Sequence, residues 1–151
     1  MKYVLLLRGV NVGTKNSLPM ADLRTMLEEI GCTKVTTYIQ SGNAVLSTSL
    51  SKAKLLKTFE QALAKYMGRQ VATTLRTAAE LDAIINGNPF ARIATDPKYL
   101  CVTFLSGPPH AGALATLNER DWSPEAFQVA GSEVLFLAPE RPGAQRARGG
   151  A

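Results

Sequence analysis

The chain has 151 residues, of which 46% are hydrophobic and 19% are charged. This length suits one domain or two small lobes, the composition is ordinary for a soluble globular protein, and no run approaches the roughly 20 apolar residues of a membrane helix. The two cysteines, Cys32 and Cys101, make no disulfide framework, and we expect a cytoplasmic protein with no membrane partner.

The net charge of +5 is unevenly distributed along the chain. Residues 1–76 hold 11 Lys and Arg against 4 Asp and Glu, which gives +7, whereas residues 77–138 hold 3 against 7, which gives −4, and the last 13 residues give +2. A basic first half could attract phosphate, nucleotide or nucleic acid. An equally good interpretation is that the two halves complement each other.

Residues 1–76 show strand and helix patterns in the order β-α-β-β-α-β. The expected elements lie at residues 3–8, 20–30, 34–39, 44–48, 51–68 and 71–75. The first strand is apolar on both alternating faces, which is typical of a central strand, and the second helix carries Tyr66 in its predicted buried stripe. Right-handed crossovers then place the first strand beside the third and fourth, and this arrangement is the ferredoxin-like motif.

Residues 77–138 predict a second α/β lobe in the order α-β-α-β-β. A capping box at 77–80 opens its first helix, and Cys101 is expected in the core of a strand at 98–105. A short helix at 111–117 precedes a hairpin that turns at Gly131-Ser132. The fold class is therefore α+β, with a complete ferredoxin-like lobe followed by an incomplete one packed on it. The Pro/Gly/Arg-rich tail, 139–151, is expected to be poorly ordered.

Three segments of the first half carry a family resemblance. They are Lys2-Tyr3-Val4-Leu5-Leu6-Leu7-Arg8-Gly9-Val10-Asn11-Val12-Gly13, Pro19-Met20-Ala21-Asp22-Leu23 and Thr37-Tyr38-Ile39-Gln40-Ser41-Gly42-Asn43. They closely resemble the domain-of-unknown-function family 1697, and the resemblance covers most of residues 1–138. It implies a small bacterial α+β protein of two ferredoxin-like lobes without established biochemistry.

The sequence departs from that family in two places. Thr14 stands where members often have a second glycine. Members also usually continue past the last hairpin into a Gly-Arg-Ser-like segment, a helix and an Arg-Asn-Trp-Asn stretch, whereas this chain has the Pro/Gly/Arg tail. We therefore expect a divergent or truncated C-terminus.

One candidate site follows from the predicted fold, because the loop after the first strand and the turn between the second and third strands share one end of the sheet. Its residues are Arg8, Gly9, Asn11, Gly13, Lys15, Asn16, Gln40, Ser41, Gly42 and Asn43, with Arg69 nearby. Glycines let a backbone approach an oxyanion, and cations and amides add hydrogen bonds to it. The spacing is that of neither a P-loop nor a Gly-x-Gly-x-x-Gly motif. The alternative is that the two loops only brace each other.

The favoured interpretation is a binding module for a small anionic or phosphorylated ligand at this site. One alternative is an enzyme of unknown class in the same cleft, with Arg8 or Lys15 stabilising developing negative charge. A weaker alternative is a nucleic-acid-associated protein in which Tyr3 and Tyr38 share a sheet face. No catalytic residue, cofactor or metal site is assigned, and the sequence does not indicate an oligomeric state.

Overall fold

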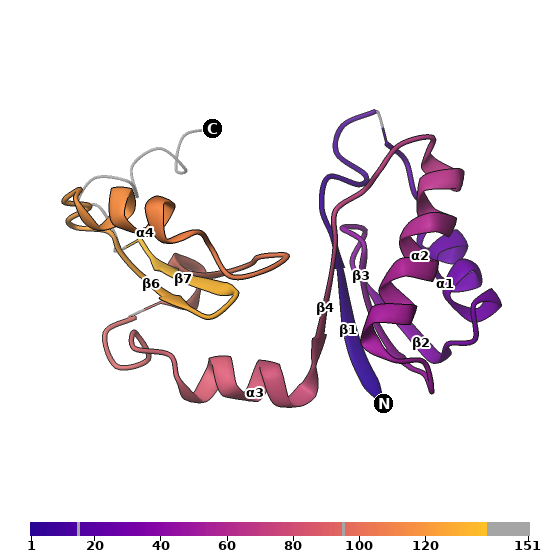
Figure 1. Cartoon of the computed structure of the whole chain (residues 1–151), viewed down its shortest axis with the longest axis horizontal. Coiled ribbons are helices and arrows are strands. Elements are labelled where there is room, and N and C mark those ends of the chain that lie inside the picture. The colour runs from indigo at the N-terminus through magenta and orange to yellow at the C-terminus, as the bar shows by residue number, and fades with distance from the viewer. Residues whose placement is uncertain (15, 95, 139–151) are drawn as a thin grey trace, which may run out of the picture. The chain divides into compact units, whose positions relative to one another are not determined.

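The computed structural model describes residues 1–14, 16–94 and 96–138 (Figure 1). The chain divides into two units, Met1–Ala83 and a second that begins at Ile84. The described residues form two antiparallel sheets and four α-helices, which confirms the α+β class. Lys15 and the tail lie outside the described residues. Within those residues, no helix combines the length and the apolar character needed to cross a membrane.

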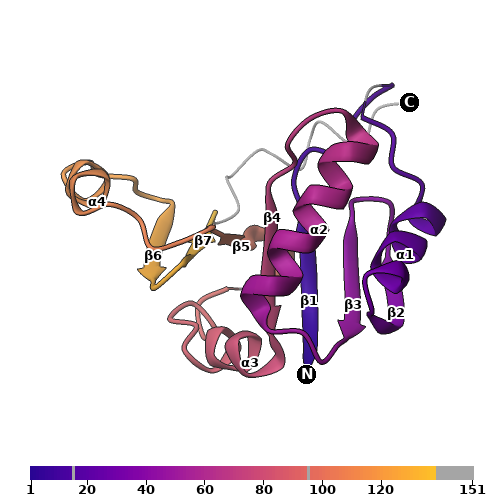
Figure 2. The same cartoon turned by 45° about the vertical axis from the view of Figure 1, so that its right-hand side comes forward.

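The first unit places one strand at the centre of a four-stranded sheet. Its elements are β1 Lys2–Leu7, α1 Met20–Glu29, β2 Thr33–Tyr38, β3 Asn43–Ser47, α2 Lys52–Met67 and β4 Thr73–Thr77. The strand order is β2-β3-β1-β4, and each neighbouring pair is antiparallel. The predicted position of β1 between β3 and β4 is thus confirmed. Figures 1 and 2 show that α1 and α2 lie on the same face of this sheet.

The core of the first unit lies between this sheet and its two helices. In β1, Tyr3 and Leu5 are buried and alternate with the partly exposed Val4 and Leu6. Leu5 pairs across the sheet with Ala44 and Leu75, both also buried, so these rows point into the core. The helices contribute Leu23, Leu27, Leu55, Phe59 and Leu63, each fully buried. Apolar residues on both faces of β1 therefore mark a central position, although only one face is deeply buried.

The helix α2 begins and ends as the sequence predicts, but one residue of its stripe is exposed. The Ser51 side chain caps the first turn by accepting a hydrogen bond from the Lys54 N–H, and Gly68 ends the helix with φ of 71°. The prediction that Tyr66 is buried is wrong, since 48% of it is exposed. Its hydroxyl instead donates to Asp22 of α1 at 2.6 Å, and a phenol at the rim of a stripe can keep this polar end in water.

The predicted capping box at the start of α3 (Ala78–Asn86) is confirmed. The Thr77 N–H donates to Glu80 Oε2 at 2.7 Å, and the Glu80 N–H donates to Thr77 Oγ1 at 3.2 Å. Lys52 Nζ adds a salt bridge to Glu80 Oε1 at 2.8 Å, which ties the start of α3 to the start of α2. The division between the two units falls inside α3 rather than at the predicted boundary before it.

The second unit is built on a three-stranded sheet in the order β5-β7-β6. Its elements are η1 Pro97–Tyr99, β5 Leu100–Phe104, α4 Ala111–Asn118, β6 Ala126–Ala130 and β7 Glu133–Leu137. Phe90, Leu135 and Leu137 form its buried cluster. The prediction that Cys101 is a core residue is wrong, because its neighbour Val102 pairs with Leu135 toward the cluster, and the alternation of the strand turns Cys101 to the exposed side.

The Glu80 carboxylate predicts a pH dependence of stability. Desolvation raises the pKa of this carboxyl, but hydrogen bonds from Lys52 and Thr77 outweigh it, and the pKa is lowered from 4.5. A lowered pKa in the folded state stabilises the fold above the unfolded-state value and loses that effect as pH falls through the folded value. Glu80→Gln should therefore reduce the loss of unfolding free energy between about pH 6 and about pH 3, measured by urea denaturation.

Lys52→Gln removes the other partner of the salt bridge and should reduce the same pH dependence. A Glu80→Gln protein that loses as much stability as the wild type over this range would contradict the assignment.

Candidate functional site

The loop after β1 and the turn between β2 and β3 meet, as the sequence predicts. β1 and β2 run in the same direction because each is antiparallel to β3, so the loop and the turn share one end of the sheet. The Leu7 N–H donates to the Gly42 carbonyl at 3.1 Å. Asn11 Nδ2 donates to the Gln40 carbonyl at 2.6 Å. Two motifs 29 residues apart in sequence are thus joined directly.

The Asn11 side chain is the centre of this junction. Its Nδ2 donates to the Leu18 carbonyl at 2.8 Å as well as to Gln40, and its Oδ1 accepts from the Leu18 N–H at 2.6 Å. Both amide hydrogens are therefore engaged. Asn11 has φ of 54°, a left-handed conformation that asparagine tolerates better than most residues. The amide holds the loop closed onto the fully buried Leu18, and this is a bracing role.

Position 42 of the turn has no room for a side chain, so only glycine fits there. Its φ is +84°, and a Cβ at this position would lie 2.7 Å from Val10 Cγ2 and 2.8 Å from Leu7 Cβ. Both distances are shorter than real contacts of a Cβ atom. The turn therefore packs its backbone directly on the apolar start of the loop, in which Val10 is buried.

Arg69 connects a third segment to the loop, as the sequence predicts. Its Nε donates to Asn16 Oδ1 and its Nη2 donates to the Gly9 carbonyl, each at 3.0 Å. Its Nη1 donates to the Gln70 carbonyl at 3.2 Å. The Asn11 N–H also donates to the Asn16 carbonyl at 2.9 Å, which closes the loop on itself. The guanidinium thus holds both ends of the loop from outside.

A second set of residues faces solvent. Arg8, Gly9, Gly13, Gln40 and Ser41 are exposed. A Cβ added at Gly9 or Gly13 would find nothing within 4 Å, so both glycines border open space. Asn43 is partly buried, and its Nδ2 donates to Ser41 Oγ at 2.8 Å. The described site residues therefore divide into groups that hydrogen-bond or pack between the loops and groups, such as Arg8, that are open to solvent.

The backbone of the loop is left-handed at three alternate residues. Gly9, Asn11 and Gly13 have φ of 72°, 54° and 65°, and the intervening valines do not share this positive sign. Val12 forms a β-bridge. The loop therefore combines an irregular backbone with the exposed cation of Arg8.

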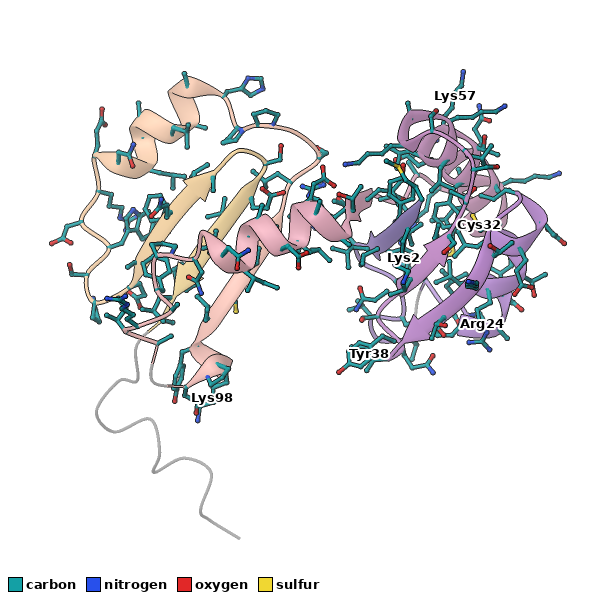
Figure 3. The ribbon with its side chains drawn as sticks, turned by 90° about the horizontal axis from the view of Figure 1, so that it is seen from below. Lys2, Arg24, Cys32, Tyr38, Lys57 and Lys98 are labelled. Atoms are coloured by element: carbon teal, nitrogen blue, oxygen red, sulfur yellow. The ribbon has the colours of Figure 1, made fainter. Side chains whose placement is uncertain are left out.

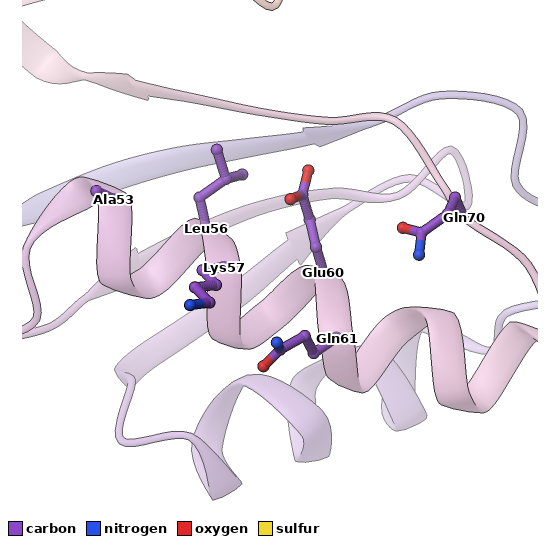
Figure 4. Close-up of a pocket in the computed structure, with 6 residues that line it drawn as sticks. All are labelled: Ala53, Leu56, Lys57, Glu60, Gln61 and Gln70. Atoms are coloured by element: carbon purple, nitrogen blue, oxygen red, sulfur yellow. The ribbon is translucent and has the colours of Figure 1, made fainter.

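Two hollows of the first unit lie elsewhere. The first, of about 400 Å³ and shown in Figure 4, is lined by Ala53, Leu56, Lys57, Glu60, Gln61 and Gln70. The second, of about 650 Å³, is lined by Asp22, Thr25, Met26, Glu29, Ala62, Lys65 and Tyr66. Neither set of lining residues includes a predicted site residue. Among the described residues, no group of three or more His, Cys, Asp or Glu is arranged to hold a metal ion.

Sequence reasoning missed two residues that hold the loop in place. Leu18 is fully buried and is bonded to the Asn11 amide through its own backbone, although it stands in a polar loop. The Ala72 carbonyl accepts from the Arg8 N–H at 3.1 Å and extends the pairing of β1 with β4. The apolar character of Leu18 immediately before Pro19 was the available signal for the first. The second has no signal in the sequence, because backbone pairing does not depend on the side chain.

The variants Gly42→Ala and Gly13→Ala separate the cost of overpacking from the cost of a left-handed backbone. Both glycines have positive φ, but only Gly42 lacks room for a Cβ. Gly13→Ala should cost roughly 1–2 kcal/mol for the left-handed conformation, and Gly42→Ala should cost about 1–3 kcal/mol more through overpacking. Urea denaturation measures both variants. Equal losses of unfolding free energy would contradict the contact of Gly42 with Val10 and Leu7.

Arg69→Ala should loosen the loop without unfolding the protein. Arg69 is exposed, so we expect its loss to lower the unfolding free energy by about 1 kcal/mol or less. Amide hydrogen exchange in residues 9–16 should nevertheless accelerate, because Gly9 and Asn16 lose their shared partner. Lys65→Ala, an exposed cation near the end of α2, serves as the control and should leave this exchange unchanged.

The comparisons with known proteins agree with this architecture. The structure is similar to that of a conserved bacterial protein, SP0830 from Streptococcus pneumoniae, with 30% sequence identity and a TM-score of 0.77. The similarity covers 89% of this chain and 74% of that one. No match was found among curated proteins. A family model described as a protein of unknown function (DUF1697) matches residues 1–135, and the chain belongs to this family.

Proposed function

We propose that this protein is a binding module for a small anionic or phosphorylated ligand, held by the loop 8–16 and the turn 40–43. The observation that carries the proposal is the exposed Arg8 at the start of a loop that the hydrogen bonds of Asn11 and Arg69 hold in one conformation. An arginine offers charge-assisted hydrogen bonds with the fork geometry that suits phosphate. Lys15 would add a second cation from the same loop.

The internal hydrogen bonds of the loop support binding rather than replace it. A loop that must be ordered by its ligand loses binding energy to that ordering, whereas a loop already fixed by Asn11 and Arg69 does not. We assign the bracing role to Asn11, Asn16 and Gly42. We assign the ligand contacts to Arg8 and to the polar side chains of the turn.

We infer further that residues 1–76 of the first unit form a ferredoxin-like lobe. Its element order and its strand order, β2-β3-β1-β4, support this inference. Residues 77–138 would then be an incomplete second lobe of the same kind. Its strands β5, β6 and β7 take the order β5-β7-β6, which corresponds to the order of β1, β2 and β3 as β1-β3-β2 in the first unit.

Arg8→Ala should weaken ligand binding without affecting stability. The probe is ribose 5-phosphate, titrated calorimetrically into the wild type and the variant. Removing a charged hydrogen-bond donor costs about 1.5–3 kcal/mol, so we expect binding to weaken roughly 10- to 100-fold. Arg92→Ala, an exposed arginine of the second unit, is the matched control and should bind as the wild type does. The proposal fails if the wild type binds no phosphate ester or if Arg8→Ala binds as tightly.

A further inference from the structure

The register of the first sheet places one exposed aromatic residue on the same face as the proposed site. Tyr38 of β2 pairs with Asn43 of β3, and Asn43 pairs with Leu6 of β1. Residues paired across a sheet point to the same face, so these three side chains form one row. The Leu6 side chain is partly exposed and lies on the face of β1 that points away from the helices. The row therefore lies on the sheet face that α1 and α2 leave uncovered.

Arg8 belongs to the same face. Its N–H donates to the Ala72 carbonyl, which continues the register of β1 with β4 by one residue beyond Leu7 and Thr73. Successive residues of a strand alternate between faces, so Arg8 follows Leu6 on the uncovered face. Tyr38 and Arg8 then stand two strands and two residues apart, which is roughly 12 Å between their backbones. Asn43 lies between them.

The Tyr38 side chain is exposed to solvent. Its exposed fraction is 71%, and Figure 3 shows it at the rim of the first unit. Within the described residues its hydroxyl has no hydrogen-bond partner, whereas that of Tyr66 is bonded to Asp22. The next residue, Ile39, is 60% exposed and has φ of 51°, a strained conformation for a β-branched residue. Strain of this kind persists where a surface has a function.

A flat aromatic ring about 12 Å from an arginine suits one chemical class of ligand. The ring offers a stacking platform, and the arginine offers a phosphate site. A nucleoside phosphate carries a planar base at one end and a phosphate at the other. The amide of Asn43 and the hydroxyl of Ser41 lie between these ends and could bond the sugar.

We propose, on the basis of the function proposed above, that Tyr38 stacks the base of a nucleotide whose phosphate binds at Arg8. The nucleotide is either free or one unit of a single-stranded nucleic acid, since both present the same base and phosphate.

The prediction that Tyr3 and Tyr38 share one face of the sheet is wrong. Tyr3 lies in the row of Leu46 and Thr77, points to the helix side and is only 2% exposed.

The test compares adenosine 5′-monophosphate with ribose 5-phosphate on the wild type, Tyr38→Ala and Tyr38→Phe. The wild type should bind the nucleotide more tightly than the sugar phosphate. Tyr38→Ala should weaken nucleotide binding about 5- to 100-fold, the range for loss of one stacked base, and leave ribose 5-phosphate unchanged. Tyr38→Phe should bind as the wild type does. Tyr66→Ala, another exposed tyrosine, is the control and should change neither affinity.

The outcomes separate the two proposals. Equal binding of the two probes, or an unchanged nucleotide affinity in Tyr38→Ala, overturns the stacking proposal and leaves the phosphate site standing. Binding of neither probe overturns both proposals. A ten-nucleotide single-stranded oligoadenylate is the third probe. If it binds more tightly than the mononucleotide with a steep salt dependence, the ligand is a strand, and equal or weaker binding indicates a free nucleotide; Tyr38→Ala must weaken either one.

Discussion

The hydrogen bonds of one side-chain amide organise the candidate site. Asn11 joins its own loop at Leu18 to the β2–β3 turn at Gln40, and so fixes two segments that the chain leaves far apart. The loop can stay in this conformation only because Asn11 tolerates positive φ and because Gly42 leaves room for Val10 beneath it. Arg69 closes the same loop from the other side. Without the amide, two peptide groups would lose their partners together.

This junction explains why binding and bracing are not exclusive alternatives here. The groups that satisfy one another engage both hydrogens of the Asn11 amide and all three Arg69 nitrogen positions. The groups that face solvent, Arg8 among them, are held in place by this framework. Six of the ten described residues with positive φ lie in the loop, in the turn or at Ile39 beside the turn. Left-handed backbone conformations are thus concentrated at one end of the sheet.

The two faces of the first sheet have different chemical characters. One face is covered by α1 and α2 and buries Tyr3, Leu5 and Leu75. The other carries partly exposed apolar residues and the exposed Tyr38 beside the cationic end of the loop. An aromatic ring that stays in water contributes little to the stability of the fold, so Tyr38 is free for the stacking role proposed above.

Local sequence patterns were enough to predict the α-helices and strands and their order, because hydrophobic period, capping residues and turn residues act locally. The capping box at Thr77, the end of α2 at Gly68 and the hairpin at Gly131 were all predicted in this way. The sequence also predicted that the loop lies beside the turn, because the directions of the strands could be inferred from their order. Three other features could be seen only in the folded chain. The rim position of Tyr66, the outward side of Cys101 and the opposite faces of Tyr3 and Tyr38 depend on register and packing, which local patterns do not encode.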